Sequence, residues 1–501
     1  MNTFSINKIR PEELKTIGHY TGYICLVLGV FMIIPVLCAI FYQDAPRYFQ
    51  AFLISAIINI LIGIILFTTY RTRNITTLSL KGSLLFVMTI WGITALFTAL
   101  PYYISGDLGI LDSFFEAMSG ITTTGFTMYP LTTFPYSISV WKCLTQWFGG
   151  LGIILFLLVV APSSVSLKRL YLAEGKTEQI TPNIRHTASI FIKVYLILTS
   201  IGVLLYLLIG LDLFDSVCYS LTAIATGGYS VHPENIDNFK DPLIQLVTMI
   251  IMLMGGTNFV IHYRIMKRNW QNIHKDIEIR AMIIIIIITT LIISIGLYTN
   301  GLYNGDYLLI LRHSLFQSVS TITSTGFIST DVNFWPPLCS HILILLMFTG
   351  CSICSTSGGI KLFNIAILFK SIWWETQKMF LPKHTIIKRK IYHDKKYREI
   401  SQNTIRTVLV YVMAYILIFI ISTMIILMCS NNFEVAYTLA AASLGNTGVG
   451  PAYINVTIPV VVKIILIIDF WVGRIGVWPL LLSIVYITSM TQSKLNNIND
   501  E

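Results

Sequence analysis

Four short stretches of the sequence combine hydroxyl-bearing and glycine residues in a pattern that could bind a dehydrated monovalent cation. The stretches end at Gly125, Gly228, Gly326 and Gly448, and the segments before these glycines align without a gap. Backbone carbonyl and threonine hydroxyl oxygens can replace the hydration shell of such an ion, and glycine supplies backbone angles that other residues resist. Each stretch places such oxygens, together with a final glycine, directly after a short segment that could form a helix.

The four stretches are similar but not identical. One such stretch alone would be interpreted as an ordinary turn outside a membrane, whereas four in register, each between two long apolar runs, favour one shared site. The first stretch offers three threonines, the second Ala225-Thr-Gly and the fourth Gly445-Asn-Thr. We therefore expect the site to discriminate between ions less sharply than a site built from four identical loops.

Apolar runs long enough to cross a bilayer recur along the whole chain. Of 501 residues, 55% are hydrophobic and 12% charged, against about 25% charged in an average globular domain. A spanning helix needs about 20 apolar residues. Ten spans are predicted, at residues 20–41, 48–69, 83–104, 138–160, 188–209, 243–263, 281–299, 338–369, 407–429 and 459–487. No separate soluble domain fits between them, and the first run is interpreted as an anchor because it lacks a small-residue cleavage site.

The spans and the repeat together predict an all-α polytopic membrane protein, in which two N-terminal spans precede four tandem helix–pore-loop–helix repeats around a central ion pore. The predicted parts are residues 1–81 for the two N-terminal helices, then 82–186, 187–280, 281–402 and 403–501 for the four repeats, the third with an intramembrane loop and a basic loop. Irregular backbone at membrane depth is tolerated where it lines a cavity. Asp112 and Asp215, or the neighbouring Ser113 and Ser216, are expected to cap the short helices that lead into the first two loops. The negative ends of these helix dipoles would then face the ion.

The net charge of +10 comes from basic residues that gather on one side of the predicted spans. With a cytoplasmic N-terminus, the inner segments hold Arg71, Arg73, Lys81, Lys168, Arg169, Lys176, Arg185, Arg264, Lys267, Arg268, Lys275, Arg280, Lys378, Lys383, Lys388, Arg389, Lys390, Lys395, Lys396 and Arg398, and the outer segments only Arg47, Lys240 and Arg312. The outer segments also hold Asp107, Asp112, Asp212, Asp215, Glu234, Asp237, Asp306 and Asp331. The asymmetry predicts that both termini are cytoplasmic, and it explains the positive charge by membrane topology rather than by nucleic-acid binding. The acidic residues on the outer side would form a negative vestibule that concentrates cations.

The repeated stretches carry a family resemblance. Residues 122–127 (TTTGFT), 225–230 (ATGGYS), 323–328 (TSTGFI) and 444–452 (LGNTGVGPA) resemble the four filter segments of the Trk/Ktr potassium transporters, and residues 146–154, 254–264 and 350–362 are further matches. The resemblance covers nearly the whole chain, and the two spans before the first repeat are similar to the TrkH and TrkG type rather than to the shorter KtrB.

The resemblance implies potassium uptake across the bacterial inner membrane, with K⁺ as the transported ion and no bound cofactor. It also implies a homodimer with one pore per protomer, and a cytoplasmic nucleotide-binding ring of the TrkA kind as regulator. The resemblance further implies that twelve residues act as ligands of a selectivity filter: Thr123, Thr124 and Gly125; Thr226, Gly227 and Gly228; Ser324, Thr325 and Gly326; Asn446, Thr447 and Gly448.

Two features are expected to form a gate below the filter. The eighth span is interrupted between Gly350 and Lys361 by Cys, Ser, Thr and Gly residues, including Gly358 and Gly359, whose low helix propensity favours an unwound segment. Arg474 lies within the last span, where a charge costs at least about 2.5 kcal/mol. The resemblance makes the unwound segment an intramembrane gate and Arg474 a cationic barrier, the alternative being an arginine paired structurally between helices.

The sequence departs from the family pattern beside Arg474. The family has a Gly-Arg-Leu-Glu run, whereas this chain has Gly473-Arg-Ile-Gly476, so the carboxylate that usually follows is missing. Asp469, one turn earlier, is the candidate counter-charge, although a spacing of five residues is poor for a direct pair on one helix.

Two other classes of function remain as alternatives. An alternating-access cation symporter would also use repeats and broken helices, although its repeats need not each contain a glycine loop. A membrane enzyme is disfavoured because the sequence contains no His-Glu-x-x-His motif, nucleotide-binding glycine loop or nucleophile motif. Cys351 and Cys354 have metal or redox spacing, but without a second pair or nearby histidines we interpret them as small buried hydrophobic residues.

Overall fold

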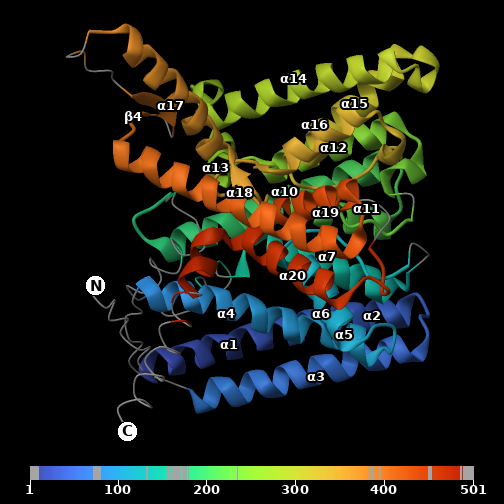
Figure 1. Ribbon diagram of the computed structural model, residues 1–501. Coiled ribbons are helices and arrows are strands. Elements are labelled where there is room, and N and C mark those ends of the chain that lie inside the picture. The colour runs from blue at the N-terminus through green and yellow to red at the C-terminus, as the bar shows by residue number, and fades with distance from the viewer. Residues whose placement is uncertain are drawn as a thin grey trace.

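The computed structural model describes residues 11–70, 80–130, 134–153, 180–233, 235–382, 389–393, 396–449 and 454–483, with single positions at 155, 158, 171, 178, 385, 485 and 488. Several predicted features lie outside the described residues: Arg71, Arg73, Lys168, Arg169, Lys176, Glu234, Lys383, Lys388, Lys395, the side chain of Lys81, residues 450–452 of the fourth stretch, and parts of the predicted spans 138–160 and 459–487. The described chain is mostly helical, and most of its long helices run side by side across the molecule (Figure 1).

Each of the predicted parts of the chain contains several of the described elements. The N-terminal part contains α1 (Pro11–Phe31), α2 (Ile33–Phe41) and α3 (Pro46–Thr69). The first repeat contains α4 (Leu80–Thr98), α5 (Leu100–Ile104), α6 (Ile110–Ile121) and α7 (Tyr136–Leu151). The second contains α10 (Ile184–Leu208), α11 (Leu213–Ile224), η1 (Asn235–Phe239), α12 (Pro242–Gly256), α13 (Phe259–Met266) and η2 (Ile273–Lys275). The third contains α14 (Ile277–Thr299), η3 (Leu302–Gly305), α15 (Tyr307–Ile322), η4 (Val332–Phe334), α16 (Pro337–Met347), β1 (Thr349–Gly350), β2 (Ile360–Lys361), α17 (Leu362–Phe380), β3 (Lys390–His393) and β4 (Lys396–Glu399). The fourth contains α18 (Gln402–Ser430), α19 (Phe433–Gly445) and α20 (Val460–Ile475).

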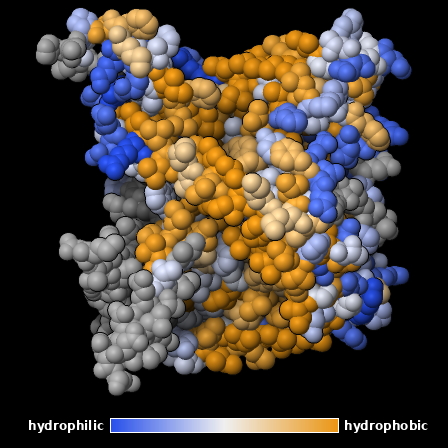
Figure 2. Space-filling model, in the orientation of Figure 1, coloured by the Kyte–Doolittle hydropathy of each residue, from blue (hydrophilic) through white to orange (hydrophobic). Residues whose placement is uncertain are grey.

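Six of the described helices are long and apolar enough to cross a membrane, or seven if the bent pair α12 and α13 counts as one span. They agree within a few residues with seven of the ten predicted spans. Figure 2 shows what this means at the surface: a broad apolar band covers the middle of the visible face, and hydrophilic residues gather at its edges. The chain is a multi-pass membrane protein.

The four short helices α6, α11, α15 and α19 pack around one centre. Each packs against the second helix of the preceding repeat: α11 on α7, α15 on α12, α19 on α16, and α6 on α20. The last contact joins the fourth repeat to the first, so the repeats form a closed ring. Close packing near the ends of the short helices depends on glycine, because a Cβ atom on Gly149, Gly255 or Gly473 would lie within 2.4 Å of a short-helix carbonyl oxygen.

The second helices of all four repeats end several residues before the predicted spans do, which corrects the expectation of unbroken spans at 138–160, 243–263 and 459–487. α7 ends before Gly152 and α20 before Gly476, both with positive φ. α12 and α13 meet at 105°, and α16 ends at Met347. The predicted interruption after Gly350 is therefore confirmed, but it is one case of a break that every repeat contains.

The first two short helices begin earlier than predicted, so the expected caps are wrong. α6 begins at Ile110 after Gly109, and α11 begins at Leu213 with Asp212 as its N-cap, which accepts hydrogen bonds from the N–H groups of Phe214 and Asp215. Asp112 and Asp215 therefore lie in the first turn of each helix, where their carboxylates bind other side chains: Asp112 pairs with Lys463, and Asp215 contacts His232 at 2.7 Å.

Candidate functional site

The four glycine stretches have the same backbone conformation. Two residues before each final glycine, the chain enters the left-handed region, with φ of 58° at Thr123, 53° at Thr226, 57° at Ser324 and 51° at Asn446. The final glycines also have positive φ, of 89° at Gly125, 68° at Gly228, 85° at Gly326 and 62° at Gly448. A left-handed residue commonly ends a helix by turning its N–H back to the last carbonyls. In each repeat, the N–H of this left-handed residue donates to the carbonyl oxygen of the residue three positions earlier.

The four loops meet in a closed ring of backbone groups. A Cβ atom added to a final glycine would collide with a carbonyl oxygen of the next repeat: 2.4 Å for Gly125 and Gly227, 1.9 Å for Gly228 and Thr325, 1.7 Å for Gly326 and Thr447, and 2.2 Å for Gly448 and Thr124. The order runs from repeat one to four and back to one. Glycine is therefore required both for its conformation and for the close approach of neighbouring loops.

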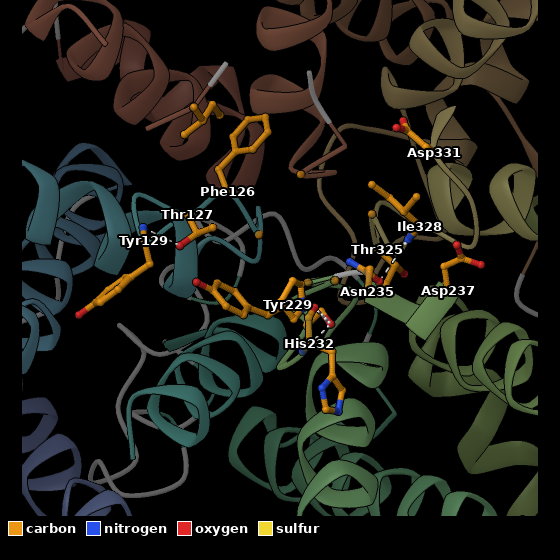
Figure 3. A pocket seen from close by; sticks show the side chains of 18 of the residues that line it. Phe126, Thr127, Tyr129, Tyr229, His232, Asn235, Asp237, Thr325, Ile328 and Asp331 are labelled. Carbon is orange, nitrogen blue, oxygen red and sulfur yellow. Dashed lines mark hydrogen bonds between the residues drawn. The ribbon is translucent and has the colours of Figure 1, made fainter. Parts of the chain in front are cut away.

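A cavity of about 460 Å³ opens on this ring, and its wall includes all four final glycines. Figure 3 shows the side chains that surround it, which come from loops of different repeats: Thr127 and Tyr129, Tyr229 and His232, and Ile328 and Asp331. Asp237 and Asp331, two of the acidic residues expected on the outer side, line the cavity. Their carboxylates make it attractive to cations.

A buried ion pair between α6 and α7 contacts the first and second loops. Nζ of Lys142 on α7 lies 2.8 Å from Oε1 of Glu116 on α6, and both side chains are at most 1% exposed. Glu116 also accepts hydrogen bonds from the Tyr229 hydroxyl at 2.6 Å and the Met128 N–H at 2.8 Å. The Lys142 ammonium lies 4.1 Å from the centre of the Tyr229 ring. The pair therefore holds the loops of the first and second repeats together.

Gln146 on α7 supports the second loop directly. Its Nε2 donates to the carbonyl oxygen of Gly227 at 2.7 Å, and its Oε1 accepts from the Tyr229 N–H at 3.2 Å. Because the Gly227 carbonyl belongs to the ring of backbone groups, Gln146 fixes one member of that ring.

Residues 348–361 contact loop residues that precede the final glycines. Thr226 donates from its hydroxyl to that of Thr356 at 3.0 Å, and a Cβ atom on Gly358 would lie 2.4 Å from the side-chain oxygen of Asn446. Gly350 and Lys361, at the two ends of the segment, are partners in the short parallel pair β1 and β2. Gly359 has positive φ of 68°. Four of the six residues predicted for a gate thus belong to one segment, which contacts the second and fourth loops.

Arg474 lies between this segment and the first loop. Its Nη1 donates to the Thr123 hydroxyl at 3.2 Å and to the carbonyl oxygen of Thr356, and its Nη2 donates to the carbonyl oxygen of Gly150 at 2.7 Å. The guanidinium therefore links a loop residue, the end of α7 and the 348–361 segment.

Asp469 does not pair with Arg474, which corrects the expectation of a counter-charge. Its two carboxylate oxygens accept from Ser422 at 2.7 Å and Ser443 at 3.2 Å, and Asp469 is 1% exposed. The physical reason is the helical spacing: five residues before Arg474, the side chain projects towards α18 and α19 instead.

Sequence reasoning missed Glu116, Lys142, Gln146 and Thr356. Lys142 carried the same signal as Arg474, a charge within a predicted span, and that signal would have led to its partner. Gln146 and Thr356 lie in stretches that resembled the family, but nothing in their residue types shows which loop each one contacts. Cys351 and Cys354 are both buried, as expected of small hydrophobic residues.

This fold and site define a multi-pass membrane protein whose four repeats meet at a cavity, and the carboxylates of Asp237 and Asp331 in its wall attract cations. The sequence model of one family, TrkH, described as cation transport protein, matches residues 48–496. An uncharacterized cation transporter of Methanocaldococcus jannaschii is 30% identical over 95% of this chain and 96% of its own length. The Trk system potassium uptake protein TrkH of Escherichia coli is 30% identical over 94% of this chain and 98% of its own.

A solved structure is also similar. The potassium transporter TrkH from Vibrio parahaemolyticus matches with a TM-score of 0.81 and 26% identity, over 94% of this chain and 98% of that one. The chain belongs to the TrkH family of cation transport proteins. Family membership assigns it to transport and sets the membrane-enzyme alternative aside.

Proposed function

We propose that the protein takes up potassium by channel-like permeation through the ring of four loops, with the outer cavity as the entrance. The observation that carries this proposal is the closed order of contacts at Gly125, Gly228, Gly326 and Gly448, since each places a carbonyl of one repeat against the glycine of another. Carbonyl rings of this kind replace the hydration shell of K⁺. The relatives named as potassium transporters support the choice of ion.

The filter consists in this proposal of the twelve predicted ligands. The shared backbone geometry supports equivalent carbonyl positions in the four repeats, while the side chains differ: Asn446 donates from Nδ2 to the Thr124 hydroxyl at 2.8 Å and to the Phe470 carbonyl at 3.0 Å. An asymmetric ring is expected to select K⁺ over Na⁺ less strongly than four identical loops.

The 348–361 segment, with Gly350, Gly358, Gly359 and Lys361, acts in this proposal as a gate below the filter, and Arg474 as a fixed positive charge beside it. Asp469 takes no part in neutralising that charge. The same proposal includes five further features, which are expected from the charge pattern and the family resemblance. They are the division into residues 1–81 and four repeats, the cytoplasmic termini, the inner-membrane location, the homodimer and the nucleotide-binding ring subunit.

The test is uptake of rubidium-86 by proteoliposomes that contain the purified protein alone. We expect uptake that K⁺ competes for at lower concentration than Na⁺, and that continues without a proton gradient. Uptake that needs a proton gradient and saturates at slow carrier rates would favour the alternating-access symporter. Uptake that Na⁺ and K⁺ inhibit equally would contradict the filter.

A further inference from the structure

Three residues that the proposed ion path does not use form a buried cluster where α14 begins. Asp276, Glu278 and His393 each offer one ligand atom, and these atoms all lie within 4.8 Å of one another. The side chains belong to residues that are 5%, 0% and 3% exposed. One imidazole nitrogen with two carboxylate oxygens is a donor set that proteins use for divalent ions such as Zn²⁺ and Mn²⁺.

Glu278 carries an unsatisfied oxygen in this cluster. Its Oε1 accepts a hydrogen bond from the Ile353 N–H at 2.8 Å, but its Oε2 is buried without a hydrogen-bond partner. A buried carboxylate oxygen left without a donor is costly, because it has lost its water and gained nothing. A cation held between Glu278 and its two neighbours would satisfy that oxygen.

His393 is oriented as a metal ligand would be. Its Nε2 lies 2.7 Å from Oε1 of Glu178, and its Nδ1 faces Oδ2 of Asp276 at 3.2 Å. Metal-binding histidines almost always donate their other ring N–H to a carboxylate or carbonyl oxygen. Glu178 is held in turn by Asn258, whose Nδ2 donates to Oε2 at 2.7 Å. This arrangement leaves Nδ1 as the nitrogen that faces the Asp276 carboxylate.

We propose that Asp276, Glu278 and His393 bind one divalent transition-metal ion, with Glu178 positioning the imidazole. The ion would connect three parts of the chain: His393 on the hairpin β3–β4, the first turn of α14, and, through Glu278, the Ile353 N–H within the 348–361 segment. Metal binding thereby restrains the segment. That this restraint affects transport rests on the proposed gate, whereas the binding site itself does not.

The experiment measures binding without transport. Protein purified in detergent is stripped with a chelator and titrated calorimetrically with Zn²⁺, Mn²⁺ and Mg²⁺ separately, and its metal content is then determined. We expect one Zn²⁺ or Mn²⁺ per chain and weaker binding of Mg²⁺. Glu278→Gln, which can still accept from Ile353, and His393→Gln should each weaken binding at least tenfold, and Glu178→Gln by about tenfold.

His232→Gln is the matched control, because it removes a histidine–carboxylate contact elsewhere in the protein, and it should bind as the unmutated protein does. If the unmutated protein shows no saturable binding, the site is overturned. The same holds if the Glu278→Gln and His393→Gln variants bind the metal as tightly as the unmutated protein does. Hydrogen exchange gives an independent readout: metal should slow the exchange of residues 351–354 in the unmutated protein. Binding without that protection would overturn the link to the 348–361 segment.

Discussion

Arg474 donates a hydrogen bond from Nη1 to the Thr123 hydroxyl across 3.2 Å, so a fixed cation lies against the first loop two residues before its final glycine. The same guanidinium donates to the backbone of Thr356 and Gly150. It is therefore both a charge near the proposed ion path and a brace for the 348–361 segment. The two roles can be separated by experiment.

Removing the charge should speed ion flow. At an effective dielectric constant of about 20, two unit charges ~6 Å apart repel by roughly 3 kcal/mol, so Arg474→Ala is expected to raise rubidium-86 uptake by severalfold or more, with the segment still a steric barrier. Arg474→Lys keeps the charge but not the planar fork, and uptake should stay close to that of the unmutated protein. A folded Arg474→Ala variant with unchanged or reduced uptake would leave Arg474 with a structural role only.

Asp469→Asn tests whether the Asp469 carboxylate influences the effect of the Arg474 charge on ion uptake. Because Ser422 and Ser443 bind this carboxylate, the substitution should change basal uptake far less than Arg474→Ala does. If Asp469→Asn instead lowers uptake strongly, the carboxylate neutralises Arg474 in a state other than this structure.

The buried Glu116–Lys142 pair should affect the free energy of unfolding more than an exposed ion pair would. Glu116→Gln leaves a fully buried ammonium without its carboxylate and is expected to cost about 3–5 kcal/mol of unfolding free energy. The double variant with Lys142→Met should regain part of that loss, because the uncompensated charge is gone. Unfolding in detergent, monitored for the single and double variants, measures the difference. Equal stability of all three proteins would show that the pair contributes nothing.

His232 should make uptake depend on external pH. Its hydrogen bond to Asp215 raises the pKa of His232 above its usual value, with Asp212 adding to the effect and burial opposing it. The stabilisation from the pair is complete below the unfolded pKa of about 6.5 and is lost as pH rises through the raised pKa. His232 lines the outer cavity together with Asp237, so its loss of charge should favour cation entry.

The measurement is rubidium-86 uptake at external pH 5.5 to 8.5 with a fixed internal pH. Uptake should rise with pH in the unmutated protein, and His232→Gln should remove that rise, while the exposed His341→Gln should retain it. A rise that survives in His232→Gln assigns the pH dependence to another group.

Labelling of introduced cysteines tests the predicted orientation. Asn238 and Gln271 are both exposed and lie on opposite sides of the bent pair α12 and α13. If the termini are cytoplasmic, a cysteine in place of Asn238 should react with an impermeant reagent in whole cells, and one in place of Gln271 only after permeabilisation. The reverse pattern would contradict the positive-inside assignment.

The sequence predicted the fold class and the positions of the four loops because both depend on local patterns. Long apolar runs predict membrane helices, and the left-handed residue and the glycine recur at fixed spacing in each repeat. Even Asn446, which breaks the threonine pattern, has the same backbone conformation as Thr123, because asparagine tolerates the left-handed region well.

What the sequence could not predict depends on contacts between distant parts of the chain. The apolar pattern continues through the breaks after α7, α12 and α20, so hydropathy alone gave unbroken spans. The glycines at two of these breaks, Gly152 and Gly476, were visible, but a glycine alone does not show that the chain takes a positive φ and ends the helix there. Likewise, Asp469 could be placed on the helix of Arg474, but not directed to Ser422 and Ser443 without the neighbouring helices.

The central claim is that the ring of glycine-bearing loops selects the ion, and the bi-ionic K⁺/Na⁺ reversal potential of Gly326→Ser tests it most directly. A side chain at Gly326 would place Cβ 1.7 Å from the Thr447 carbonyl oxygen, so the ring must shift. Gly210→Ser is the matched control, because Gly210 also has positive φ, of 93°, but a Cβ atom there would meet nothing within 4 Å. We predict that Gly326→Ser lowers the K⁺/Na⁺ permeability ratio about tenfold, equivalent to about 1.4 kcal/mol, while Gly210→Ser leaves it unchanged. An unaltered permeability ratio in a folded Gly326→Ser protein would contradict the account.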